Sequence, residues 1–127
     1  MIAEKENLKN PEQIKEIHLE YLRAGARLIR TNTFAANTMF LADMQEVKET
    51  VRAGYEIAKE AVTAFQAENG KEIPVFIGAD LGPIYDLDHQ DYDNVLQEYK
   101  EICDTFLSCG ADCFVFETPA KSRQAQA

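Results

Sequence analysis

The stretch GARLIRTNTFAAN, Gly25–Asn37, changes character halfway along its length. Its first half is an apolar run after a glycine, which predicts a short strand over Arg27–Arg30. Its second half carries three hydrogen-bonding side chains and an aromatic ring: Thr31, Asn32, Thr33 and Phe34. Such groups either cap the backbone of a following helix or face a small polar ligand, and the local sequence leaves both interpretations open.

Outward from this stretch, apolar segments alternate with amphipathic ones. Helical periodicity predicts helices in residues 11–25, 45–70 and 94–110, the last beginning near Asp91 or Asp93, with a short helix or helical turn in residues 36–44. Apolar runs predict two further strands, Val75–Ala79 and Cys113–Phe116. Asn10 and Pro11 are suited to starting the first helix. This alternation indicates βαβ units and an α/β fold with about three parallel strands.

Composition limits the class of protein. The 127 residues are 46% hydrophobic and 28% charged, which suits one soluble domain over residues 1–127. The net charge is -9 without a Lys/Arg cluster, so a nucleic-acid or anionic-membrane surface is not expected. No apolar run reaches the roughly 18 residues of a membrane span, and the charged N-terminal segment lacks the apolar core of a signal peptide. We expect a cytoplasmic protein.

Ligands of parallel α/β folds bind beyond the carboxyl ends of the strands. Here those ends read RTNTF, GADLGP and FET, and all three are polar or rich in glycine. Glu117 follows a dry strand, so its carboxylate needs a cation, either a substrate ammonium group or an Arg or Lys of the protein. Gly82 and Pro83 form either a plain turn or a loop that a ligand can approach closely.

Other chemistry-bearing residues form no recognisable site. The acidic loop DLDHQDYD, with His89, does not fit a calcium-loop pattern, and His18 lies on a helix with no partner in view. Three cysteines without a CxxC pair predict ordinary buried thiols: Cys103, Cys109 and Cys113. Phosphate-binding glycine loops are missing, which argues against a flavodoxin-like phosphate-binding domain.

The segments NPEQIKEIHLEYLRAGARLIRTNTFAAN, IGADLGPI and CGADCFVFET together resemble the homocysteine S-methyltransferase family. The resemblance covers about Asn7 to Thr118. It implies part of a (β/α)8 barrel. It also implies transfer of a methyl group to the zinc-bound thiolate of homocysteine, which gives methionine. By resemblance, Glu117 faces the amino group of homocysteine, and the remaining pocket residues are Thr31, Asn32, Thr33, Phe34, Asn37, Gly82 and Pro83.

Departures from the family pattern shape the remaining expectations. The family's first strand has no counterpart before Asn10, and the three cysteines do not occupy the family's zinc positions. We therefore expect strands two to four of the barrel, an incomplete segment that binds no zinc, is inactive alone and associates with itself. The alternative is a non-catalytic α/β half-barrel that acts through self-association. The methyl donor stays open among methyltetrahydrofolate via cobalamin, betaine and S-methylmethionine.

Overall fold

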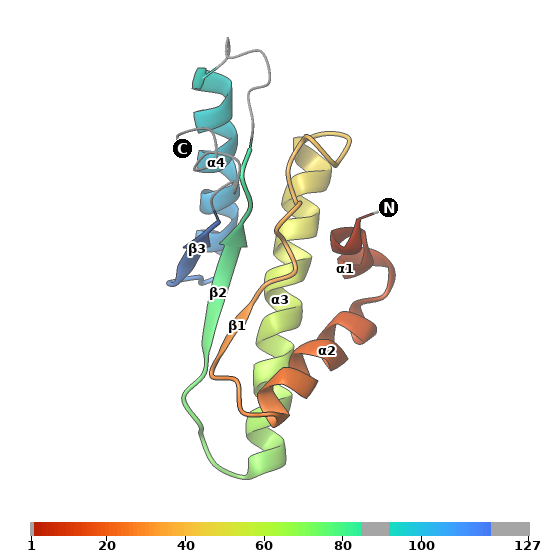
Figure 1. Ribbon diagram of the computed structural model, residues 1–127, viewed down its shortest axis with the longest axis vertical. Helices are drawn as coiled ribbons and strands as arrows, with labels where there is room; N and C mark the ends of the chain where they lie inside the picture. The colour runs from red at the N-terminus through yellow and green to blue at the C-terminus, as the bar shows by residue number, and fades with distance from the viewer. Residues whose placement is uncertain (1, 85–91, 118–127) are drawn as a thin grey trace, which may run out of the picture.

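Three parallel strands form one sheet in the order β1-β2-β3. The computed structural model describes residues 2–84 and 92–117 of the chain (Figure 1). The strands within them are β1 (Leu28–Arg30), β2 (Phe76–Leu81) and β3 (Phe114–Phe116). The predicted parallel α/β arrangement is confirmed, because a helix runs between each strand and the next.

Strand β2 extends beyond the predicted end at Ala79 and includes Asp80 and Leu81. Two interactions prolong it. The backbone N–H of Glu117 donates to the carbonyl of Leu81 at 2.9 Å. The side-chain hydroxyls of Thr31 and Thr33, in the segment after β1, bond to the backbone of Asp80. The predicted strand end was therefore wrong by two residues, and Asp80 belongs to the sheet.

The helical elements are η1 (Ala3–Lys5), α1 (Glu6–Lys9), α2 (Pro11–Arg23), α3 (Met44–Asn69) and α4 (Tyr92–Ser108). The three long helices were predicted, whereas η1 and α1 were not. Asn10 precedes α2 but makes no side-chain cap, since its amide donates to Glu6 instead. The predicted helical turn is present, because the carbonyl of Asn37 accepts from the N–H groups of Phe40 and Leu41. No described helix is long and apolar enough to span a membrane.

Two helix ends, each followed by Gly-Ala in the sequence, share one hydrogen-bonding pattern. After α2, the N–H of Ala26 donates to the carbonyl of Tyr21, five residues back, and after α4 Ala111 bonds in the same way to Phe106. The glycine before each alanine has a positive φ, 115° at Gly25 and 96° at Gly110. These glycines end their helices and turn the chain into the next strand.

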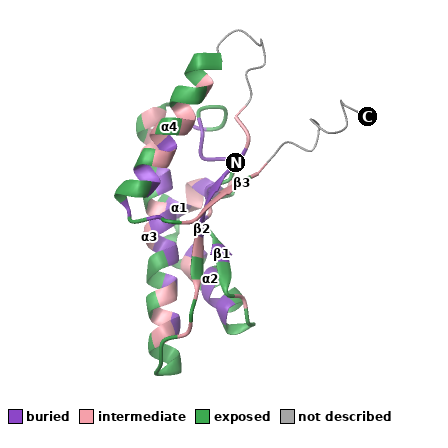
Figure 2. Cartoon of the chain, turned by 90° about the vertical axis from the view of Figure 1, so that its left-hand side faces the viewer, coloured by how far each residue is buried: buried purple, intermediate pink, exposed green. Residues whose placement is uncertain are grey.

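Helices α3 and α4 cover one face of the sheet, and α2 packs on α3 beside the β1 edge (Figures 1 and 2). One buried cluster joins α3, α4 and β2, and a second joins α2, α3 and β1. The opposite face carries apolar side chains that face solvent: Leu28 is 50% exposed and its strand neighbour Phe76 is 62% exposed.

Self-association stays a prediction, and this exposed apolar face with its two edge strands gives it a physical basis. Sedimentation velocity of the 14.3 kDa chain should show species larger than a monomer that grow with concentration. Phe76→Lys should shift the distribution toward monomer, whereas Leu107→Lys, which changes an exposed leucine on α4, should not. A compact monomer at all concentrations would contradict the prediction.

Candidate functional site

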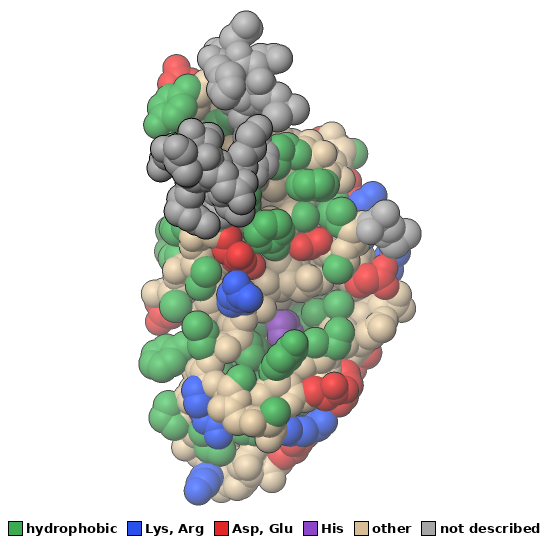
Figure 3. Space-filling view, in the orientation of Figure 1, with side chains coloured by type: hydrophobic (Ala, Val, Ile, Leu, Met, Phe, Trp, Pro, Cys, Tyr) green, Lys and Arg blue, Asp and Glu red, His purple; other side chains and the backbone are tan. Residues whose placement is uncertain are grey.

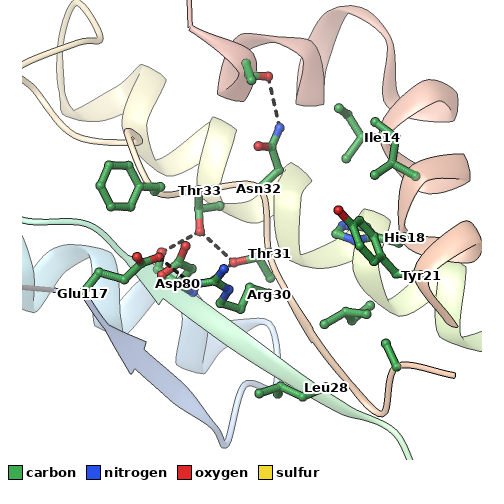
Figure 4. A pocket seen from close by; sticks show the side chains of 15 residues that line it. Ile14, His18, Tyr21, Leu28, Arg30, Thr31, Asn32, Thr33, Asp80 and Glu117 are labelled. Atoms are coloured by element: carbon green, nitrogen blue, oxygen red, sulfur yellow. Dashed lines mark hydrogen bonds and ion pairs between the residues drawn. The ribbon is translucent and has the colours of Figure 1, made fainter. Parts of the chain in front are cut away.

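A pocket of about 630 Å³ opens between α2 and the carboxyl end of the sheet. On the face shown in Figure 3, hydrophobic side chains surround the histidine, and basic and acidic side chains lie together above it. Figure 4 shows that the two ends differ in chemistry, with charged and hydroxyl groups at the strand ends and apolar groups on α2. The lining residues are Ala3, Ile14, Ile17, His18, Tyr21, Ala26, Leu28, Ile29, Arg30, Thr31, Asn32, Thr33, Phe34, Asp80 and Glu117.

The residues predicted to bind substrate divide into two groups. Those that line this pocket are Thr31, Asn32, Thr33, Phe34 and Glu117. Asn37, Gly82 and Pro83 do not line it. The Asn37 side chain is buried, and its Oδ1 accepts from the N–H of Met39 at 3.0 Å, which stabilises the turn after Phe34.

Gly82 is needed for a close approach, although the approaching group belongs to the protein. A Cβ atom at this position would lie 2.2 Å from the carbonyl oxygen of Phe34 and 3.0 Å from its ring. The loops after β1 and β2 therefore touch backbone to backbone, and any side chain at Gly82 would force them apart.

Two threonine hydroxyls and the backbone of Asp80 form a closed ring of hydrogen bonds. The N–H of Asp80 donates to Oγ1 of Thr31 at 3.0 Å, and Oγ1 of Thr33 donates to the carbonyl of Asp80 at 2.6 Å. The hydroxyls themselves lie 2.7 Å apart. Because Thr33 uses its hydrogen on the carbonyl, Thr31 must donate to Thr33. The ring continues the β1–β2 ladder where the backbone of β1 has already turned away.

The sequence left open whether Thr31, Asn32 and Thr33 cap a helix or face a ligand. In the structure these side chains bond to other parts of the protein instead of capping a helix. No helix follows Thr33 directly, and α3 is capped by Asp43, whose side chain accepts from the N–H of Glu46. The side chain of Asn32 points to the N-terminal segment, where it donates to the carbonyl of Ala3 at 3.0 Å and to Oδ1 of Asn7 at 2.9 Å.

The N-terminal segment buttresses this loop, a role that sequence reasoning missed. Asn7 is fully buried and its amide donates to the carbonyls of Asn32 and Thr50 at 2.8 and 3.2 Å. The buried carboxylate of Glu4 accepts from the N–H of Ala35 at 2.9 Å. The one sequence feature that could have indicated this role is Asn7 among charged neighbours, because a buried amide needs specific hydrogen-bond partners.

Three charged groups meet at the polar end of the pocket. Nη1 of Arg30 lies 3.1 Å from Oε2 of Glu117, so the protein supplies one of the two cations considered for this carboxylate. Asp80, also missed by sequence reasoning, is 5% exposed, and its Oδ1 has no hydrogen-bond partner among the described residues. Burial and the adjacent carboxyl of Glu117 raise the pKa of Asp80 to about 7.

The opposite wall of the pocket comes from α2 and is mainly apolar. His18 is buried there beside Ile14 and Tyr21, and its Nε2 has no hydrogen-bond partner in the described part of the chain (Figure 4). Burial lowers the pKa of His18, so the ring is neutral at physiological pH. This wall can contact an aliphatic or thiol-bearing chain.

The cysteines do not fit a zinc centre. Cys103 lies within α4, Cys109 is buried at the end of that helix, and Cys113 precedes β3 at the amino end of the sheet, away from the pocket. Burial raises the pKa of the Cys103 thiol, which disfavours the thiolate that zinc needs. Within residues 2–84 and 92–117, no three His, Cys, Asp or Glu side chains are arranged to hold a metal ion. The acidic loop DLDHQDYD lies largely within residues 85–91, outside the described residues.

Gly54 of α3 packs closely on Thr33 and Asn7, so replacing it with alanine should destabilise the protein although the position is helical. A Cβ atom there would lie 2.8 Å from Cγ2 of Thr33 and 2.9 Å from Nδ2 of Asn7. Gly54→Ala should therefore lower the free energy of unfolding by about 1–3 kcal/mol. Relief of helix entropy alone would raise it by roughly 0.5–1 kcal/mol. Urea denaturation distinguishes the two signs, and a stabilised variant would contradict this packing.

The pKa of Asp80 predicts a pH dependence of stability. A carboxyl whose pKa rises on folding binds its proton more tightly in the native state. Its contribution to the free energy of unfolding is therefore fully present below about pH 4 and is lost as the pH rises to about 7. Relative to Asp80→Asn, the wild-type free energy of unfolding should fall across this window by up to about 1.4 kcal/mol per pH unit. Urea denaturation from pH 4.5 to 8 measures the difference; parallel profiles would refute it.

Sequence comparisons place these features in a family. The homocysteine S-methyltransferase family model matches residues 2–127. The homocysteine S-methyltransferase of Escherichia coli K12 is 32% identical over 80 residues, 60% of this chain. A methionine synthase of Mycobacterium leprae is 29% identical over 118 residues, 88% of this chain. The chain spans only 26% and 10% of these two relatives.

Structural comparison agrees. The metallated form of the E. coli homocysteine methyltransferase MmuM superposes with a TM-score of 0.75 and 27% identity, covering 89% of this chain and 44% of that enzyme. Its apo form gives a TM-score of 0.69 and 29% identity, covering 90% and 41%. The three strands and their helices thus correspond to part of a (β/α) barrel, and the chain belongs to the homocysteine S-methyltransferase family.

Proposed function

We propose that this chain provides a homocysteine-binding surface of a homocysteine S-methyltransferase, with the pocket between α2 and the sheet as its amino-acid site. Family membership and the position of the pocket at the carboxyl ends of parallel strands support this proposal. The single observation that carries it is the convergence of Glu117 with Asp80 and Arg30 at one end of that pocket.

The two ends of the pocket suit the two ends of homocysteine. Its ammonium group would meet the carboxyl groups of Asp80 and Glu117, while its carboxylate would be attracted to the guanidinium of Arg30. Its aliphatic chain would lie on the apolar wall formed by residues such as Ile14 and Tyr21. A flat aromatic ligand or a phosphate does not carry the paired positive and negative charges that would match these side chains.

The ion pair with Arg30 does not remove Glu117 from this role. The side chains of Arg30 and Glu117 keep 56% and 29% of their surface exposed, so solvent reaches the pair and a ligand can approach it. Exposed ion pairs of this kind contribute at most about 1 kcal/mol. The Arg30–Glu117 contact can therefore rearrange when a substrate with both charges binds.

Methyl transfer is proposed only for the enzyme to which such a surface belongs. The family resemblance implies a zinc-bound thiolate, and the described residues of this chain do not fit a zinc centre. The transfer step is accordingly assigned to none of them. Their proposed tasks are to bind the amino acid, to orient it and to shield its aliphatic part from water.

Glu117→Gln tests this function, because the amide keeps the shape of the side chain and removes its charge. A charge-assisted hydrogen bond is worth roughly 1.5–3 kcal/mol, so the affinity for L-homocysteine should fall about ten- to a hundredfold. Isothermal titration calorimetry on the full chain measures it. Glu72→Gln, at an exposed site before β2, is the matched control and should bind as wild type does. Unchanged affinity in Glu117→Gln would make Glu117 an internal ion-pair partner only.

A further inference from the structure

We propose that Asp80 acts with Glu117 as the receptor for the substrate's ammonium group, and that the Asp80 carboxyl releases a proton when this group binds. The proposal rests on the proposed function, which supplies an amino-acid ligand. It adds a residue that the sequence did not indicate, and it gives that residue a chemical task separate from that of Glu117.

The geometry fixes Asp80 for this task. Both backbone polar groups of Asp80 are held by the hydroxyls of Thr31 and Thr33, so the residue cannot turn away from the pocket without breaking the ring. Its carboxyl lines the pocket, is almost fully buried and interacts with the carboxyl of Glu117, while its Oδ1 has no hydrogen-bond partner among the described residues. A buried acceptor without a donor costs free energy, and an ammonium N–H would satisfy it.

The same ring engages both threonine hydroxyls. Each hydroxyl hydrogen is already donated, from Thr31 to Thr33 and from Thr33 to the carbonyl of Asp80. They act as positioning residues for Asp80. The negatively charged acceptors among the residues that line this pocket are the carboxyls of Asp80 and Glu117, which Figure 4 shows converging from β2 and from the end of β3.

The charged groups around Asp80 account for the release of its proton. The charged groups that act on Asp80 are Glu117 beyond β3, Arg30 on β1 and Glu4 in η1, and Glu4 is occupied by the N–H of Ala35. With a proton on Asp80, Glu117 and Arg30 neutralise each other. Homocysteine arrives as a zwitterion, and with its carboxylate on Arg30 its ammonium would hydrogen-bond directly to the carboxyls of Asp80 and Glu117. This contact favours the ionised form of Asp80, and the proton of its carboxyl passes to solvent. The pKa of Asp80, near 7, makes this exchange available at physiological pH.

Calorimetry of the full chain tests the exchange, with binding measured in two buffers of different ionisation enthalpy at pH 6 and pH 8. L-Homocysteine should release about 0.9 proton at pH 6 and bind about tenfold more weakly there than at pH 8. The probe 4-sulfanylbutanoate has the same thiol and carboxylate but no amino group, so it should release none. It also controls for any proton lost from the thiol.

Asp80→Asn should abolish both the proton release and the pH dependence, and at pH 8 it should weaken homocysteine binding about ten- to a hundredfold. Asp112→Asn, an exposed site at the amino end of β3, should behave as wild type. Should Asp80→Asn fail to fold by circular dichroism, the wild-type comparison of the two ligands still decides. Homocysteine binding without proton release, or unchanged in Asp80→Asn, would overturn the role of Asp80 alone. Failure of the wild type to bind homocysteine would overturn the proposed function and this inference with it.

Discussion

The hydrogen-bonded ring of Thr31, Thr33 and the Asp80 backbone is the constraint on which the pocket depends. Strand β1 has only three residues, and its ladder with β2 ends at the bond between the N–H of Thr31 and the carbonyl of Gly78. Beyond that point the two hydroxyls take the place of a strand. They satisfy buried backbone groups of β2 and hold the Asp80 side chain at the mouth of the sheet.

Tertiary contacts from both sides keep the ring in place. Gly54 of α3 allows the helix to approach Thr33 closely, and Asn7 and Glu4 bond to the backbone on the other side. An N-terminal segment that looks like charged surface in the sequence therefore determines the shape of a loop about 25 residues later. The loop at the strand ends is thus held in place by α3 and by the N-terminal segment.

Sequence periodicity was enough for the architecture and for the edge at which the pocket lies. The apolar runs located the three described strands, and the predicted helix ranges ended at residues 25 and 110, within two residues of the observed ends, because these signals are local. Asp80 was not predicted as a site residue, because the strand was expected to stop at Ala79. Its place in β2 depends on hydroxyls almost fifty residues earlier in the chain. The buried roles of Glu4 and Asn7 were not predicted for the same reason, because polar residues become buried only through partners that the local sequence pattern does not contain.

The contact between Gly82 and the carbonyl of Phe34 has a consequence for which ligands the pocket can admit. A side chain in the way of a bulky ligand can rotate, but a backbone carbonyl pressed against a glycine moves only if two strands move with it. The backbone of Phe34 is thus fixed against the loop after β2. Adaptation to ligands of different length must come from α2, whose Tyr21 and Ile17 remain partly open to solvent. Under the proposed function, substitutions on that helix should accordingly change which amino-acid ligands fit more than substitutions in the glycine loop.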